Sequence, residues 1–227
     1  MMEKTIVMSL GGSVIVPDKI DINFLKSFKK TIDNHTNKGY KFAIICGGGK
    51  IARDYQKAAS QISRQSNDYL DWLGIHATKM NAWFMKSVFG KDAEKFIVDD
   101  PRKKVSFTRN ILIAGGWKPG WSTDYDSVLL AKNLGVKTII NMSNIDYLYD
   151  KDPKKYNNAK KIKNISWKRY RKISGSKWKA GLNAPFDPVA AKEAEKSGLR
   201  VFIIGKDLKN FEKLLDGKSF KGTIINS

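Results

Sequence analysis

The chain has 227 residues, 41% of them hydrophobic, and its 42 Lys and Arg against 22 Asp and Glu give a formal net charge of +20. This composition supports a folded core and excludes a wholly disordered chain. No apolar run approaches the ~18 residues needed to cross a bilayer, and residues 1–10 are too short and mixed for a secretory signal. The single cysteine, Cys46, excludes an intrachain disulfide or a zinc site with two thiolates. We expect a cytoplasmic protein that binds no membrane, and we assign no metal ligands.

Short apolar runs that end in glycine alternate along the chain with helical patterns. The first predicted strand covers residues 5–10 and runs into Gly11-Gly12-Ser13, and Asp21 is placed to cap the helix that follows. The pattern predicts further strands at 42–46, 95–98, 110–114, 137–141, 200–204 and 223–225. It predicts helices at 22–38, 50–60, 71–88, 124–134, 188–198 and 208–215, with a loop or small hairpin at 146–163.

This alternation predicts the fold class. Short apolar strands without polar alternation are buried on both faces, and intervening helices connect parallel neighbours. We therefore expect an α/β protein with a mostly parallel central sheet and helices on both faces. No linker rich in proline or serine divides the chain, so we expect one domain whose two lobes part near residues 116–124.

Three predicted strands end in glycine clusters, at 11–12, 47–49 and 115–116. Ligands of parallel sheets bind beyond the carboxyl ends of the strands, and glycine lets backbone N–H groups approach an anion. A phosphate site is the favoured interpretation. A P-loop is rejected because Trp121 replaces its lysine, and a Rossmann site is weakly supported because 61–71 is polar and helical where a second strand should end.

Six motifs in order resemble the archaeal-type uridylate (UMP) kinases of the amino-acid kinase family, over essentially the whole chain. They are Gly11-Gly12-Ser13, Gly47-Gly48-Gly49-Lys50-Ile51-Ala52-Arg53, Asp71-Trp72-Leu73-Gly74-Ile75, Gly115-Gly116-x-x-Pro119-Gly120-x-Ser122-Thr123-Asp124, Asn144-Ile145-Asp146-x-x-Tyr149-x-x-Asp152-Pro153 and Asp187-Pro188-x-Ala190-Ala191-Lys192.

The resemblance implies a three-layer α/β/α sandwich and transfer of the γ-phosphoryl group of ATP to UMP, with Mg²⁺, in pyrimidine nucleotide biosynthesis. It implies one domain over 1–227, with an acceptor lobe at about 1–122 and an ATP lobe at about 123–227. It also implies a homo-oligomer, commonly a hexamer. The alternatives are a paralogue with another phosphate acceptor and a non-catalytic basic protein that binds RNA or nucleotides.

The same resemblance implies which residues form the candidate site. The implied ATP contacts are Gly12, Ser13, Gly48, Arg53, Ser143, Asn144, Tyr149 and Asp152. The implied UMP contacts are Gly47, Asp71, Trp117, Lys118, Pro119, Gly120, Trp121, Ser122 and Thr123.

Three of the implied residues are candidates for catalysis. Lys50 and Arg53 could compensate the charge of the transferring group, and Asp124 could orient a lysine or a hydrated Mg²⁺. Lys50 can also be an ordinary surface lysine, and Asp71 can cap a helix as well as contact ribose.

The sequence departs from the family pattern in the acceptor loop. Trp117 and Trp121 stand where the family has smaller or imidazole side chains, and Tyr125 stands where alanine is usual. Ser9 occupies the place of a lysine found in many amino-acid kinases, which archaeal-type uridylate kinases also lack. The added aromatic rings could tighten the pocket around a pyrimidine, change the acceptor or mark a loss of activity.

Residues 151–180 hold 12 Lys and Arg and one acidic residue, a net of +11 by subtraction. The aromatic residues interleaved with them are Tyr156, Trp167, Tyr170 and Trp178. Basic residues with spaced rings suit single-stranded nucleic acid, so RNA binding is the second hypothesis. The favoured alternative is a loop that is basic because ATP is anionic.

Overall fold

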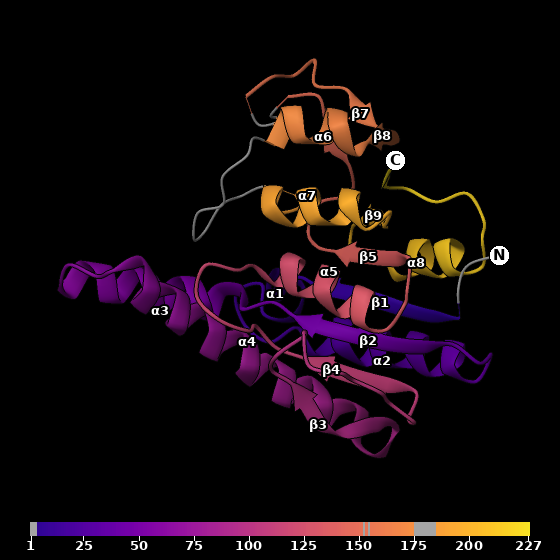
Figure 1. Cartoon of the computed structure of the whole chain (residues 1–227), viewed down its shortest axis with the longest axis horizontal. Helices are drawn as coiled ribbons and strands as arrows, with labels where there is room; N and C mark the ends of the chain where they lie inside the picture. Colours follow the sequence, from indigo (N-terminus) through magenta and orange to yellow (C-terminus); the bar gives the residue numbers. More distant parts are fainter. Residues whose placement is uncertain (1–3, 152, 154, 175–184) are drawn as a thin grey trace.

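A central sheet of eight strands organises the computed structural model, which describes residues 4–151, 153, 155–174 and 185–227. Its strand order is β3-β4-β2-β1-β5-β9-β10-β8 (Figure 1). The strands are β1 (Thr5–Leu10), β2 (Lys41–Cys46), β3 (Ala93–Val98), β4 (Ile111–Ala114), β5 (Thr138–Met142), β8 (Asn164–Ser166), β9 (Arg200–Ile204) and β10 (Thr223–Asn226). Neighbours run parallel except β9 and β10, which confirms the expected mostly parallel sheet.

Helices cover both faces of this sheet. The helices are α1 (Gly12–Ile15), α2 (Ile22–Thr36), α3 (Gly49–Ile62), α4 (Asn67–Phe89), α5 (Thr123–Asn133), α6 (Trp167–Ser174), α7 (Pro188–Lys196) and α8 (Leu208–Leu215), with a 3₁₀ turn at Gly90–Asp92. Alternate residues of β1 face opposite sides: Met8 joins the core under α2, α4 and α8, and Val7 joins the core under α5, α6 and α7. The result is the three-layer sandwich that the resemblance implied.

Side-chain caps begin several of the helices, and the cap predicted at Asp21 is among them. The Asp21 side chain accepts a hydrogen bond from Phe24 N, and Ser122 and Asp187 cap α5 and α7 in the same way. Helix α4 begins earlier than expected, because Ser66 accepts from Tyr69 N and closes the helix start there. Asp71 therefore lies inside α4, and its interpretation as a helix N-cap is wrong.

The segment between β5 and α7 contains structure that the pattern did not predict. The expected hairpin is present as β6 (Leu148–Tyr149) paired with β7 (Lys161–Ile162), but β8 and α6 follow it. In α6, Trp167 is 0% exposed and its Nε1 donates to Leu199 O at 2.9 Å, while Tyr170 is 2% exposed.

Buried rings cannot stack on bases, so Trp167 and Tyr170 are not RNA-binding side chains, contrary to the second hypothesis. Tyr156 is exposed. Trp178 lies outside the described residues.

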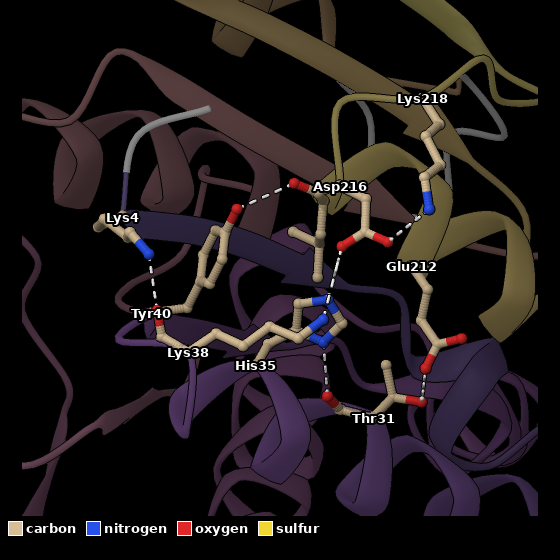
Figure 2. Close-up of polar contacts among 9 residues, drawn as sticks. Lys4, Thr31, His35, Lys38, Tyr40, Glu212, Asp216 and Lys218 are labelled. Atoms are coloured by element: carbon tan, nitrogen blue, oxygen red, sulfur yellow. Dashed lines mark hydrogen bonds and ion pairs between the residues drawn. The ribbon is translucent and has the colours of Figure 1, made fainter. Parts of the chain in front are cut away.

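A polar cluster joins α2 and α8 at the edge of the sheet where β2 begins (Figure 2). Tyr40 donates its hydroxyl hydrogen to Leu215 O at 2.9 Å, and His35 Nε2 lies 3.8 Å from Asp216 Oδ1. These contacts lie near the start of β2, at the opposite end of the strands from the glycine turns. Within the described residues, no helix has the length and apolar composition that a membrane span requires.

Candidate active site

The carboxyl ends of the central strands surround a cavity of about 590 Å³. Its walls come from the turns after β1 and β2, the loops after β4 and β5, and α3 and α4. The predicted site residues that line it are Gly12, Ser13, Gly47, Gly48, Arg53, Asp71, Trp121, Ser122, Thr123, Asp124, Ser143 and Asn144. The anion cradles expected after separate strands therefore open into a common space.

The first two glycine turns lie against each other, backbone to backbone. A Cβ on Gly12 would come within 1.9 Å of Gly49 N, and one on Gly47 within 2.4 Å of Gly12 N. Gly49 also has a φ of +67°, in the left-handed region that favours glycine. Only glycine at these positions allows the two turns to lie this close.

Asn81 of α4 fixes the turn after β2. It is 3% exposed, and its Nδ2 donates to Gly47 O at 2.7 Å and Gly48 O at 3.3 Å. These bonds fix the backbone of the turn, whose residues Gly47, Gly48 and Gly49 all line the cavity. Sequence reasoning missed Asn81, although a polar residue between Ala77 and Ala82 on a buried helix face was a visible signal.

Three backbone N–H groups of the loop after β4, residues 115–122, donate to side chains and so hold the loop in place. Gly116 N donates to Thr78 Oγ1 at 2.6 Å, and Gly120 N donates to Asp71 Oδ2 at 2.8 Å. Burial raises the pKa of the Asp71 carboxyl, and the neighbouring Asp68 contributes in the same direction. Asp71 thus both supports the loop and lines the cavity.

Asp124 lies on the cavity floor at the start of α5, and it accepts three hydrogen bonds. Ser9 Oγ and Asn141 Nδ2 donate to its Oδ1 at 3.0 and 2.8 Å, and Asp187 N donates to its Oδ2 at 3.1 Å. Burial outweighs these donors and raises the pKa of Asp124 to about 7. Ser9, which stands at the position of the absent lysine, therefore orients Asp124.

Asp126, which sequence reasoning missed, supplies the third anchor of the loop. Its Oδ2 accepts from Trp117 N at 3.1 Å, and its Oδ1 is buried without a hydrogen-bond partner among the described residues. Burial raises the pKa of Asp126 to about 8, and the neighbouring Asp124 adds to the shift. Its position in α5, two residues after Asp124, was the available signal.

Other predicted site residues do not line the cavity. The Lys50 ammonium pairs with Asp54 Oδ2 at 2.6 Å and lies 3.7 Å from Asp18 Oδ1. Tyr149 is half-buried in the β6–β7 hairpin. The remaining loop members outside the lining are Trp117, Lys118, Pro119 and Gly120. Asp152 lies outside the described residues.

Arg53 is the one cationic side chain that lines the cavity within the described ranges. Those residues also contain no group of three or more His, Cys, Asp or Glu arranged to hold a metal ion. Glycine backbone, the Arg53 guanidinium and the Asp71 and Asp124 carboxyls on a common cavity suit the binding and transfer of a phosphoryl group.

Sequence comparison places the chain in a kinase family. A model of the amino acid kinase family matches residues 4–205, and the chain belongs to this family. It is 36% identical over 224 residues to the uridylate kinase of Thermococcus onnurineus, covering 97% of this chain and 98% of the relative. It is 35% identical over 228 residues to that of Thermoplasma acidophilum, covering 99% and 98%.

Comparison with solved structures agrees. The crystal structure of the uridylate kinase from Archaeoglobus fulgidus matches with a TM-score of 0.81 and 31% identity, covering 97% of this chain and 99% of that one. A UMP kinase structure from Bacillus anthracis matches with a TM-score of 0.80 at 20% identity, which supports the fold.

Proposed function

We propose that this protein is a UMP kinase, which transfers the γ-phosphoryl group of ATP to UMP and releases ADP and UDP. The observation that carries the proposal is the shared cavity: Gly12, Gly48 and Thr123 line the same space, so donor and acceptor phosphates can meet there. The relatives named uridylate kinase, matched over nearly the whole chain, support the same substrate pair.

Each side of the cavity takes one nucleotide in this proposal. The ATP phosphates lie against Gly12, Ser13 and the loop carrying Ser143 and Asn144. UMP lies under the loop after β4, with its phosphate at the start of α5, where Thr123 N–H and the helix dipole favour an anion. The division follows the two lobes, about 1–122 and 123–227, only in part, because Gly12 and Ser13 of the first lobe contact ATP and Thr123 of the second contacts UMP.

Arg53 lies at the start of α3, beside the turn after β2, and its guanidinium compensates the charge of the transferring phosphoryl group. Lys50, one turn earlier, contributes only if its ammonium leaves Asp54 when nucleotides bind. Phosphoryl transfer needs positioning and charge compensation more than covalent help from the protein.

The Asp124 environment fits a Mg²⁺ ion carried by ATP. Its two oxygens already accept three hydrogen bonds, which leaves little capacity for direct coordination. Mg²⁺ retains several waters and binds substrate phosphates, so Asp124 would orient a metal-bound water. The ion, when bound, would neutralise charge on the ATP phosphates.

The test is a substrate panel. ATP with Mg²⁺ is offered with UMP, CMP or AMP, and ADP and UDP formation are followed. UMP should give the highest kcat/KM. A folded protein that is inert toward all three acceptors would refute the function while leaving the fold intact, and preference for another acceptor would support the paralogue alternative.

Two further expectations belong to this proposal. We infer a homo-oligomer, with a hexamer implied by the family resemblance. We also infer a cytoplasmic location, because ATP and UMP are available there and the buried Cys46 is a free thiol. UDP made at this site would supply pyrimidine nucleotide biosynthesis.

A further inference from the structure

Three aromatic side chains form a stack that runs from the acceptor loop into α5. The Trp121 and Tyr125 rings are 4.2 Å apart between centroids with an interplanar angle of 23°, and the Trp117 and Trp121 rings are 6.2 Å apart at 20°. The sequence departs from the family pattern at all three of these positions. The three substitutions are therefore not independent, because their rings pack on one another.

Two cationic side chains pack on the Trp117 ring, at the end of the stack away from Tyr125. The Arg102 Cζ atom lies 4.1 Å from the Trp117 ring centroid, and Lys118 Nζ lies 4.3 Å from it. Arg102 is in turn held by Asp100 through two bonds, Nε to Oδ1 and Nη2 to Oδ2, each 3.0 Å. The stack is thus tied to the turn after β3, outside the loop that it supports.

The backbone N–H anchors that hold the loop to side chains end at Gly120, one residue before Trp121. The N–H groups of Gly116, Trp117 and Gly120 bind Thr78, Asp126 and Asp71, and no such backbone bond holds Trp121 among the described contacts. Trp121 nevertheless lines the cavity, whereas Trp117 and Tyr125 do not. What fixes the Trp121 ring is therefore packing against its two aromatic neighbours.

We propose that Tyr125 and Trp117 are positioning residues. They hold Trp121, and with it the end of the loop after β4 that contacts the cavity, in place before UMP binds. This inference rests on the proposed function, which places UMP in the part of the cavity under the loop after β4. A loop ordered in advance spares the acceptor the entropy cost of ordering it. The ATP side, built from other loops, is independent of the stack.

Tyr125→Ala tests the positioning role, because Tyr125 does not line the cavity. The KM for UMP should rise about 3- to 10-fold, the range that one lost aromatic pair supports, while the KM for ATP stays within about twofold. Tyr125→Phe keeps the ring and should restore the wild-type KM. Trp117→Leu, in an exposed loop outside the lining, repeats the test if Tyr125→Ala fails to fold.

Hydrogen exchange gives a readout that needs no activity. Amides of the loop peptide 116–123 should exchange faster in Tyr125→Ala than in the wild type and Tyr125→Phe, both with and without UMP. An unchanged KM for UMP, or equal rises in KM for both nucleotides, would overturn the proposal, as would unchanged exchange. If the wild type phosphorylates no UMP, the proposed function fails separately, and the exchange result still decides whether the stack orders the loop.

Discussion

Three buried carboxyls gather where α5 and α7 begin, and their protonation links stability to pH. Burial raises the pKa of Asp124 to about 7 and that of Asp126 to about 8, and it also raises the pKa of Asp187. Because these values exceed those of the unfolded chain, the native state binds more protons between about pH 4 and pH 8. Their contribution to stability is fully present below pH 4 and is lost as the pH rises through 7 and 8.

Asp126→Asn should reduce this pH dependence, because it removes a charge that is buried at high pH while keeping an oxygen for Trp117 N. At pH 9 the variant should be more stable than the wild type by about 1–3 kcal/mol, with a smaller difference at pH 6. Urea unfolding at pH 6, 7, 8 and 9 measures it. Asp92→Asn, at an exposed site, is the control. A stability difference that shrinks as the pH rises would contradict the prediction.

Arg53→Ala should lower kcat by about 100-fold or more, because no other cation of the described residues lines the cavity. Steady-state ADP release under saturating UMP and ATP measures it. Lys57→Ala, one turn further along α3 and exposed, should leave kcat within about twofold. A change of only a few-fold in Arg53→Ala would remove Arg53 from the catalytic assignment.

Helix α4 acts on the glycine turn through one amide, and this contact can be separated from the aromatic stack. Asn81→Ala leaves the carbonyls of Gly47 and Gly48 without their donor in a buried place, which should cost about 1–3 kcal/mol of stability. Because the turn lies between the two nucleotides in the proposed function, the KM values for UMP and ATP should both rise. Kinetics and urea unfolding of the variant measure these effects, and Ser87→Ala, exposed on the same helix, is the control. A rise confined to UMP would show that the turn serves the acceptor alone.

The strands and most helices could be predicted because their signals are local. Apolar runs ending in glycine mark β1, β2 and β4, and α8 begins and ends at the predicted residues. Helix α6 gave no such signal, because half of its eight residues are basic and only Trp167 and Tyr170 are buried. Their burial depends on β8 and α7 packing over them, which the sequence of α6 does not specify.

In the candidate site, too, some residues could be predicted from the sequence and others could not. Gly12, Gly48 and Thr123 could be placed together from the rule that parallel strands end at a common edge. Asn81 and Asp126 could not, because each acts through a hydrogen bond to a loop backbone, 34 and nine residues away, that only folding brings into contact, and neither belongs to a motif. The same holds for the Trp117–Trp121–Tyr125 stack, whose members were identified as departures from a pattern but whose mutual contact appears only in three dimensions.

At the scale of the whole molecule, one face of α4 exposes large apolar side chains that no other described residue covers. On α4, Trp72, Met80 and Trp83 are 41%, 66% and 57% exposed, and His76 lies between them against Trp72. Their spacing of three or four residues places them on one face of the helix. Helices α3 and α4 extend together past the sheet (Figure 1). Large exposed apolar patches commonly mark interfaces, so we expect this face to be covered by a second copy of the chain.

Trp83→Asp should therefore shift the assembly toward smaller species, because a carboxylate buried between two copies loses its hydration without gaining a partner. Light scattering coupled to size exclusion, at several protein concentrations, measures the mass of each species. Ser219→Asp, which adds the same charge to an exposed loop after α8, should leave the mass unchanged. The measurement should be made at moderate and high salt, because a net charge of +20 on each chain opposes association most strongly at low ionic strength. A wild-type protein that is monomeric under both conditions, or a Trp83→Asp variant with the wild-type mass, would exclude this face of α4 as the interface.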